Sequence, residues 1–130
     1  MFVDASALVA ILTEEADAET LTKRLNAAQH RFTSAVAIFE TLAALSRKTL
    51  RDVETLAADL EEFLAESNIE VRPIIEANGW AAAEAHFHLG KRSGHPARLN
   101  LGDCFAYAMA KQHGVPLLHN GDDLAHTDLA

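Results

Sequence analysis

"LNLGDCFAYAMAKQHGVPLLHNGDD", residues 99–123, carries the clearest pattern of secondary structure in the chain. Residues 99–114 place apolar side chains at helical spacing behind Asp103, and Gly114 is the residue type that most often ends a helix. The short apolar run "VPLLH" (115–119) then predicts a strand, and "NGDD" predicts a turn. A helix that leads directly into a strand is typical of α/β proteins.

Upstream of that stretch, strands and helices alternate. Short apolar or alternating runs predict three more strands, at 2–3, 32–33 and 69–74. Ser34 and Asp52 are residue types that cap helices. Helical periodicity covers the segments 5–12, 17–29, 35–50, 52–67 and 76–92. This order predicts a small α/β domain with a central parallel sheet and helices on both faces.

Composition limits the class of protein. The 130 residues have the size of one domain, 1–130, and 49% of them are hydrophobic, which is enough for a core. Cys104 is the single cysteine, so an internal disulfide and a cysteine-based zinc site are excluded. No apolar run has the length of a membrane span, and "MFVDASALVA" lacks the basic start of a signal peptide. We expect a cytoplasmic protein.

The formal net charge of −8 argues against binding nucleic acid through a broad basic surface. It does not exclude a nuclease, because a cluster of acids that holds cations also gives a negative formal charge. Residues 85–102 contain Lys91, Arg92 and Arg98 and no acid. This segment is the predicted phosphate-facing stretch, and a solvated loop is an equally good interpretation.

Five acids follow predicted strands or begin helices, or lie inside an apolar helix: Asp4, Glu40, Asp103, Asp122 and Asp123. In open parallel sheets, ligands lie beyond the carboxyl ends of the strands, so several of these acids are predicted to meet there. Taken singly, Asp4 and Asp103 are equally well explained as helix caps. The pair after the last strand equally suits a turn, and only one of the two needs to point inward.

Glu40 lies in a helix whose apolar stripe is predicted to comprise Ala35, Ile38, Phe39, Leu42 and Leu45. Two interpretations of Glu40 stay open. Either it faces solvent on a side shared with Ala37, Thr41 and Ala44, or it points into a site.

Carboxylates gathered at one sheet edge repel each other unless cations are present. Oxygen ligands without cysteine or a histidine pair select hard cations such as Mg²⁺ or Mn²⁺. The chemistry that such a cluster supports is phosphodiester hydrolysis, in which the cation activates water and neutralises charge. The remaining conspicuous residues have less specific interpretations: Cys104 is a small buried residue, His119 lies at the surface, and Trp80 and Phe87 belong to the core or face a partner.

Three segments together resemble one family. "MFVDASALVAIL", "TSAVAIFETL" and "HPARLNLGDCFAYAMAKQHGVPLLHNGDDLAHTDL" closely resemble the PIN-domain family and, within it, the VapC toxins of bacterial toxin–antitoxin pairs. The likeness covers nearly the whole chain. It implies a PIN-like three-layer α/β/α sandwich around a parallel sheet, and a Mg²⁺- or Mn²⁺-dependent endoribonuclease.

The resemblance also implies roles for individual residues. Asp4 and Asp103 match the firmest metal ligands of the family, and Glu40 matches a further acid of the site. Asp123 is favoured as the fourth acid, with Asp122 a close second. Ser6 matches a hydroxyl near the site, and Leu124 departs from the family because an aromatic residue is common at its position.

The family further implies partners. Its toxins are usually inhibited by a cognate VapB-type antitoxin, whose C-terminal segment often brings a basic side chain to the acidic pocket, and they commonly form homodimers. A catalytically silent PIN-like module that binds a partner or RNA is the alternative function, and a nuclease for structured DNA or for general RNA processing is a third.

Overall fold

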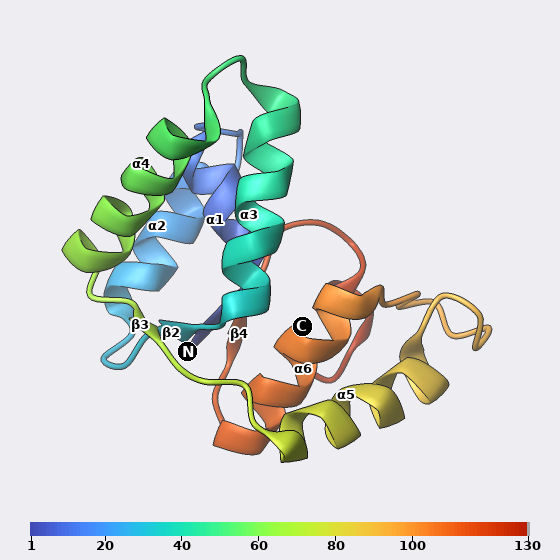
Figure 1. Cartoon of the computed structure of the whole chain (residues 1–130). Helices are drawn as coiled ribbons and strands as arrows, with labels where there is room; N and C mark the ends of the chain where they lie inside the picture. The colour runs from blue at the N-terminus through green and yellow to red at the C-terminus, as the bar shows by residue number, and fades with distance from the viewer. Residues whose placement is uncertain (130) are drawn as a thin grey trace.

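A four-stranded parallel sheet lies at the centre of the molecule, in a computed structural model that describes residues 1–129 (Figure 1). The strand order is β3-β2-β1-β4. The strands are β1 (Phe2–Val3), β2 (Phe32–Thr33), β3 (Glu70–Val71) and β4 (Leu117–Leu118). Each neighbouring pair is parallel, with Phe2 opposite both Phe32 and Leu117. All four predicted strands are confirmed.

The helices cover both faces of this sheet, as predicted (Figure 1). They are α1 (Ala5–Leu12), α2 (Ala18–Ala27), α3 (Ala35–Lys48), α4 (Val53–Glu66), α5 (Glu76–Leu89), α6 (Leu101–His113) and a 3-10 turn, η1 (Leu124–His126). Helices α1 to α4 lie together on one side, and α5 and α6 pack against each other on the other side. The fold is therefore the predicted three-layer α/β/α arrangement.

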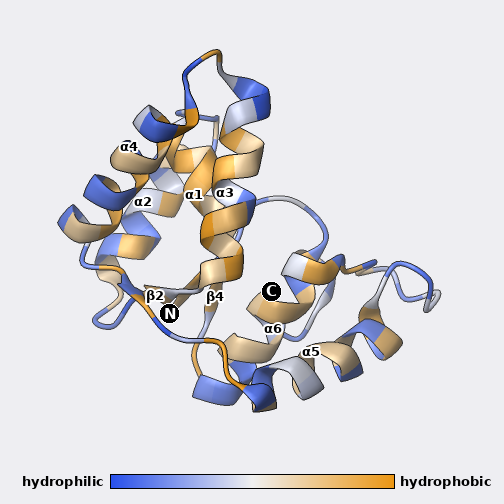
Figure 2. Cartoon of the chain, in the orientation of Figure 1, coloured by the Kyte–Doolittle hydropathy of each residue, from blue (hydrophilic) through white to orange (hydrophobic). Residues whose placement is uncertain are grey.

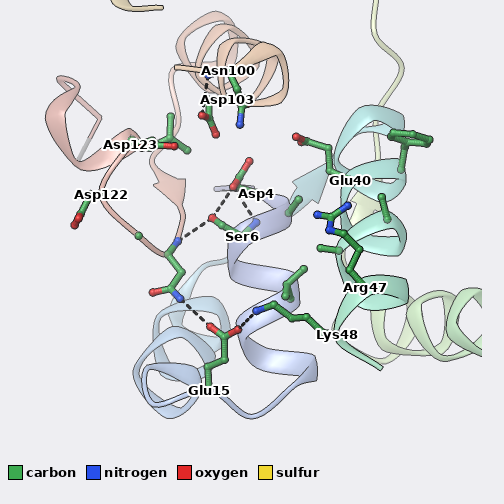
Figure 3. A pocket seen from close by; sticks show the side chains of 18 residues that line it. Asp4, Ser6, Glu15, Glu40, Arg47, Lys48, Asn100, Asp103, Asp122 and Asp123 are labelled. Carbon is green, nitrogen blue, oxygen red and sulfur yellow. Dashed lines mark hydrogen bonds and ion pairs between the residues drawn. The ribbon is translucent and has the colours of Figure 1, made fainter. Parts of the chain in front are cut away.

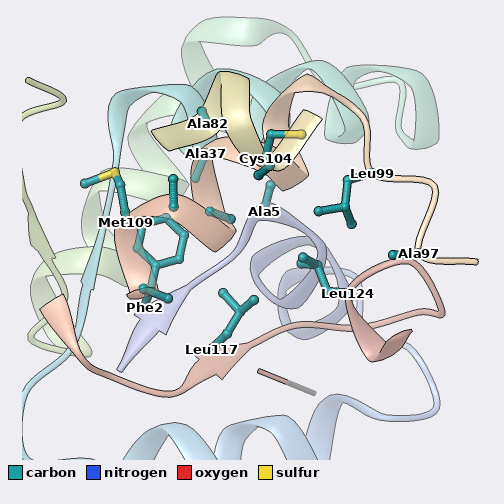
Figure 4. Close-up of a cluster of buried hydrophobic side chains, with 14 of the residues drawn as sticks. Phe2, Ala5, Ala37, Ala82, Ala97, Leu99, Cys104, Met109, Leu117 and Leu124 are labelled. Carbon is teal, nitrogen blue, oxygen red and sulfur yellow. The ribbon is translucent and has the colours of Figure 1, made fainter. Parts of the chain in front are cut away.

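The alternation of side chains along each strand explains the two layers. Phe2 and Leu117 point into one hydrophobic cluster, which Met109 and Leu99 complete from the α5–α6 side (Figure 4). Val3 and Leu118, the next residues of these two strands, point the opposite way and pack with leucines of α1, α2 and α4. Hydrophobic residues dominate the packed helices α1 and α3, whereas the loop after α5 is hydrophilic (Figure 2).

Local capping sets where the helices begin. Asp4, Ser34 and Asp52 are the N-caps of α1, α3 and α4, and each accepts a hydrogen bond from a backbone N–H of the first turn. Helix α6 is capped by Asn100 instead of Asp103, which is three residues further on. Gly114 ends α6 in the left-handed region, with φ of 63°, as expected for a glycine C-cap.

The predicted apolar stripe of α3 is partly wrong. Ala35 is exposed and Phe39 is 72% exposed, whereas Ala37 and Thr41 are buried. Thr41 can be buried because its hydroxyl donates a hydrogen bond to the Ala37 carbonyl within the helix. The rest of the stripe is confirmed, because Leu45 is buried and Ile38 and Leu42 pack against the core. The small side chains of Ala37 and Thr41 let α3 lie against α1.

Two aromatic residues of α5 are not in the core. Trp80 is 72% exposed and Phe87 is 76% exposed, so of the two interpretations only the partner-facing one remains open.

Within residues 1–129, no helix is both long and apolar enough to cross a membrane.

Candidate active site

A cavity of about 640 Å³ opens at the carboxyl edge of the sheet (Figure 3). Chain segments that follow β1 and β4 meet there, and these neighbouring strands are the point where the strand order reverses. Such a switch point is the usual ligand site of an open parallel sheet. The cavity is lined by all five acids singled out from the sequence: Asp4, Glu40, Asp103, Asp122 and Asp123.

Asp4 lies at the base of the cavity and is only 3% exposed. Its Oδ2 atom accepts hydrogen bonds from the Ser6 backbone N–H at 2.9 Å and from the Ser6 hydroxyl at 2.6 Å. Burial raises the pKa of Asp4, and the hydrogen bonds from Ser6 oppose that rise. Asp4 is therefore both the helix cap and a member of the acidic cluster, so the two interpretations of it are compatible.

Ser6 connects Asp4 to the acidic turn. Its Oγ atom donates to Asp4 and accepts a hydrogen bond from the Asn120 backbone N–H at 2.9 Å (Figure 3). This relay fixes the turn that begins after β4 relative to the end of β1. Ser6 therefore lies near the site, at the place where the sequence predicted it.

Glu40 reaches the cavity from α3, near Asp4 and Asp103 (Figure 3). Burial and the negative charges of these two aspartates raise the pKa of Glu40 to about 7. Of the two interpretations of Glu40, the structure favours the one in which it points into a site, because Glu40 lines the cavity together with Ala44, whereas Ala37 and Thr41 are buried.

Gly102 is a site residue that sequence reasoning missed. A Cβ atom at this position would overlap the carboxyl group of Glu40, so any larger residue would displace that carboxyl. The available signal was a glycine within the first turn of a helix, where it is otherwise unfavourable.

Asp103 projects from the first turn of α6. Asn100 and Asp103 form a reciprocal capping box, in which the Asn100 N–H donates to Asp103 at 3.0 Å and the Asp103 N–H donates to Asn100 at 2.9 Å. Burial, with Asp4 and Asp123 nearby, raises the pKa of Asp103 to about 6 even though the Asn100 hydrogen bond opposes the rise.

The turn after β4 distinguishes its two aspartates. Both line the cavity, but only Asp123 contributes to the raised pKa of Asp103, and the Asp122 side chain points away from the cluster in Figure 3. This geometry favours Asp123, the residue preferred from the sequence.

The predicted basic segment lies beside the cavity rather than in it. Lys91 and Arg92 line a neighbouring, mainly apolar groove between α5 and α6, which shares Asn100 with the acidic cavity. Arg98 lines neither of these two and has a left-handed backbone, with φ of 49°. Lys91 comes closest to the acids, since its charge lowers the pKa of Asp103.

The far end of the cavity carries a second polar group that the sequence did not indicate. Glu15 binds Lys48 through an ion pair of 2.6 Å and accepts a hydrogen bond from the Asn120 side chain at 3.2 Å. Lys48 lowers the pKa of Glu15. Arg47, next to Lys48, also lines this end (Figure 3). Glu15, Lys48 and Asn120 lie far apart in sequence, and no spacing rule connects them.

Two single-residue predictions have different outcomes. Cys104 is buried, as predicted, and burial raises the pKa of its thiol to about 11. His119 is half-buried rather than at the surface, and burial lowers its pKa while the charge of Asp4 opposes that change.

The donor set at the acidic end fits a hard divalent cation. Within residues 1–129, no three His, Cys, Asp or Glu side chains are close enough together to form a ready-made metal cage. Mg²⁺ does not need one, because it usually binds through one or two carboxylates and completes its coordination with water and substrate phosphate. A buried Asp4 beside carboxylates whose pKa values are raised by burial and by like charge is such a set of donors.

The fold and this site define a class of small α/β/α domains that gather carboxylates at one edge of a parallel sheet. Residues 1–129 match the family described as "PIN domain", and the chain belongs to that family.

Individual relatives are similar over their full lengths. A VapC ribonuclease of Rhizobium meliloti is 43% identical over 141 residues, which cover 98% of each chain. Ribonuclease VapC42 of Mycobacterium tuberculosis is 38% identical, over 99% of this chain and 96% of its own. The crystal structure of M. tuberculosis VapC20, a toxin that cleaves the sarcin-ricin loop, superposes with a TM-score of 0.74 over 99% of this chain and 95% of that one, at 18% identity. That structure supports the fold.

Proposed function

We propose that this chain is the toxin of a VapBC-type toxin–antitoxin pair and acts as a Mg²⁺- or Mn²⁺-dependent endoribonuclease. The observation that carries the proposal is the meeting of Asp4, Glu40, Asp103 and Asp123 in one cavity at the switch point of the sheet. Full-length similarity to proteins named VapC ribonucleases supports the choice of RNA as substrate.

Asp4 and Asp103 are the proposed direct ligands of the cation. Asp4 is buried and held by Ser6, and Asp103 is held by Asn100, so both carboxylates are oriented before any cation arrives. When bound, the divalent cation supplies positive charge that stabilises the phosphate in the transition state and makes water easier to deprotonate.

Glu40 and Asp123 act on water and on orientation. Glu40 accepts a proton from the attacking water, a role that suits a half-buried carboxylate with a pKa near neutrality. The water oxygen forms the new bond to phosphorus while the bond to the leaving nucleotide oxygen breaks. Asp123 strengthens the negative field that attracts the cation.

The same proposal includes the partners. An antitoxin of the VapB type is the proposed inhibitor, a homodimer is the proposed assembly, and the cytoplasm is the proposed location. The exposed aromatic residues Trp80 and Phe87 support a protein interface on α5.

A catalytically silent module that binds a partner or RNA is the alternative function. It gives no reason to bury Asp4 beside two other acids, because such an arrangement destabilises a protein that holds no cation. The four acids therefore favour the enzyme.

Cleavage of end-labelled cellular RNA by the purified, antitoxin-free protein tests the proposal. We expect discrete cuts with Mn²⁺ or Mg²⁺, and we expect EDTA to abolish them. A folded sample that makes no cut under any metal condition would support the silent module.

A further inference from the structure

The cavity has two ends of opposite charge. The acidic end holds the proposed catalytic carboxylates, and the other end is lined by Arg47 and Lys48. These two cations have different surroundings. Lys48 is held by Glu15 at 2.6 Å, whereas Arg47 has no hydrogen-bond or ion-pair partner among residues 1–129. A guanidinium group that lines a cavity without a protein partner is available to a ligand.

Helix geometry aligns Arg47 with the acids. Glu40 and Arg47 are seven residues apart on α3, which is two turns and places them on one face, about 10 Å apart along the helix axis. That distance is too long for one phosphate group to contact both ends. Figure 3 shows the side chains of Glu40 and Arg47 along the same wall of the cavity.

The wall between Glu40 and Arg47 is open. Ala43 and Ala44 line it, so small side chains connect the acidic end to Arg47. An extended strand whose one phosphate lies at the acids can follow this wall to the guanidinium. Arginine binds phosphate through two parallel N–H donors, which lysine does not provide.

Resting on the proposed ribonuclease function, we propose that Arg47 binds a phosphate of the RNA strand adjacent to the one that is cut. Arg47 thereby fixes the direction in which the RNA crosses the cavity. Lys48 instead maintains the wall by holding Glu15, which in turn holds the Asn120 side chain of the acidic turn.

Steady-state kinetics on an RNA that the wild-type protein cuts test this role. We expect Arg47→Gln to raise KM roughly tenfold, as for loss of a charged hydrogen bond, and to leave kcat nearly unchanged. The slope of log KM against log salt concentration should fall by about 0.7, the value for one phosphate contact on a single strand. Arg47→Lys should keep the salt slope and recover part of the KM.

Arg51→Gln is the matched control. It removes the same charge four residues away, where Arg51 pairs with Asp59 and does not line the cavity. Its KM and salt slope should equal those of the wild type, and the melting temperatures of all variants should confirm that they are folded.

Three outcomes would overturn the inference. An Arg47→Gln variant with wild-type KM and salt slope would overturn it while leaving the ribonuclease function intact. A fall in kcat with an unchanged salt slope would show that Arg47 positions the acids instead of binding RNA. If the wild-type protein cuts no RNA, the proposed function itself fails, and this inference fails with it.

Discussion

The two ends of the cavity differ in whether their carboxylates have partners that compensate their negative charge. At the basic end, Glu15 has Lys48, Asn120 and Thr13 as partners, and its pKa is lowered. At the acidic end, Glu40 and Asp103 face other carboxylates, and their pKa values are raised to about 7 and about 6. The ion pair and hydrogen bonds at the basic end hold the wall of the cavity in place. At the acidic end the carboxylates repel each other, and a bound ligand of positive charge would relieve that repulsion. This difference is the reason why we propose the acidic end as the cation site.

The largest expected effect is on catalysis at the acidic end. Asp103→Asn keeps the size of the side chain and its capping hydrogen bonds but removes the charge. We expect RNA cleavage to fall by more than about 100-fold, because even changes to groups that only support a metal ligand cost 10–100-fold. Asp128→Asn is the control and should cleave normally, because Asp128 binds Tyr107 and Lys111 further along α6 and does not line the cavity. Equal rates for the two variants would contradict the assignment of the site.

Close packing around Glu40 gives the next effect. Gly102→Ala places a methyl group where the Glu40 carboxyl lies, so that carboxyl has to move aside, and we expect lower activity with little change in the free energy of unfolding. Gly79→Ala in α5 is matched to it, because a Cβ there meets nothing within 4 Å, and this variant should keep its activity and be neutral or slightly stabilising. RNA cleavage and denaturant unfolding compare the two variants. A Gly102→Ala variant that cleaves RNA as fast as Gly79→Ala would show that the approach of α6 to Glu40 is not tight.

The raised pKa values predict how stability depends on pH without metal. Between the unfolded pKa near 4.5 and the folded pKa near 7, the native state binds more protons at Glu40 than the unfolded state does. The free energy of unfolding therefore falls as pH rises through this window. In EDTA, the melting temperature should decrease from pH 5 to pH 7.5, and Glu40→Gln should flatten that decrease. A wild-type melting temperature that does not change over this range would argue against crowded carboxylates.

The smallest effect is expected at the basic end. Lys48→Gln breaks an exposed ion pair, and such pairs contribute about 0–1 kcal/mol to stability. The melting temperature should change little, and it should not respond to Mn²⁺ differently from that of the wild type. A large loss would mean that the Glu15 cluster is as important to the fold as the core is.

Much of the fold could be predicted from local pattern. The strands, the caps Asp4, Ser34 and Asp52, and the Gly114 helix end follow from residue types and periodicity. The buried face of α3 could be predicted only in part, because an alanine and an internally bonded threonine are buried beside Leu45 while Phe39 is exposed. Hydrophobicity alone does not reveal that close helix packing prefers small side chains.

Part of the candidate site could be predicted from the sequence, and part could not. The acids could be singled out because they follow strands or begin helices, and topology brings those positions together. Gly102, Asn120 and Arg47 could not, since each acts through a contact with a residue distant in sequence or through its place on the cavity wall. The raised pKa of Asp103 also could not be predicted, because it depends on burial and on acids that are close only in three dimensions.

Calorimetric titration of the wild-type protein and Asp4→Asn with Mn²⁺ at pH 7.5 measures whether the uncompensated carboxylates at the acidic end form a cation site. We predict that the wild type binds Mn²⁺ and gains melting temperature with it, and that Asp4→Asn, although folded, does neither. Equal binding of Mn²⁺ by both proteins, or no binding by the wild type, would contradict the account.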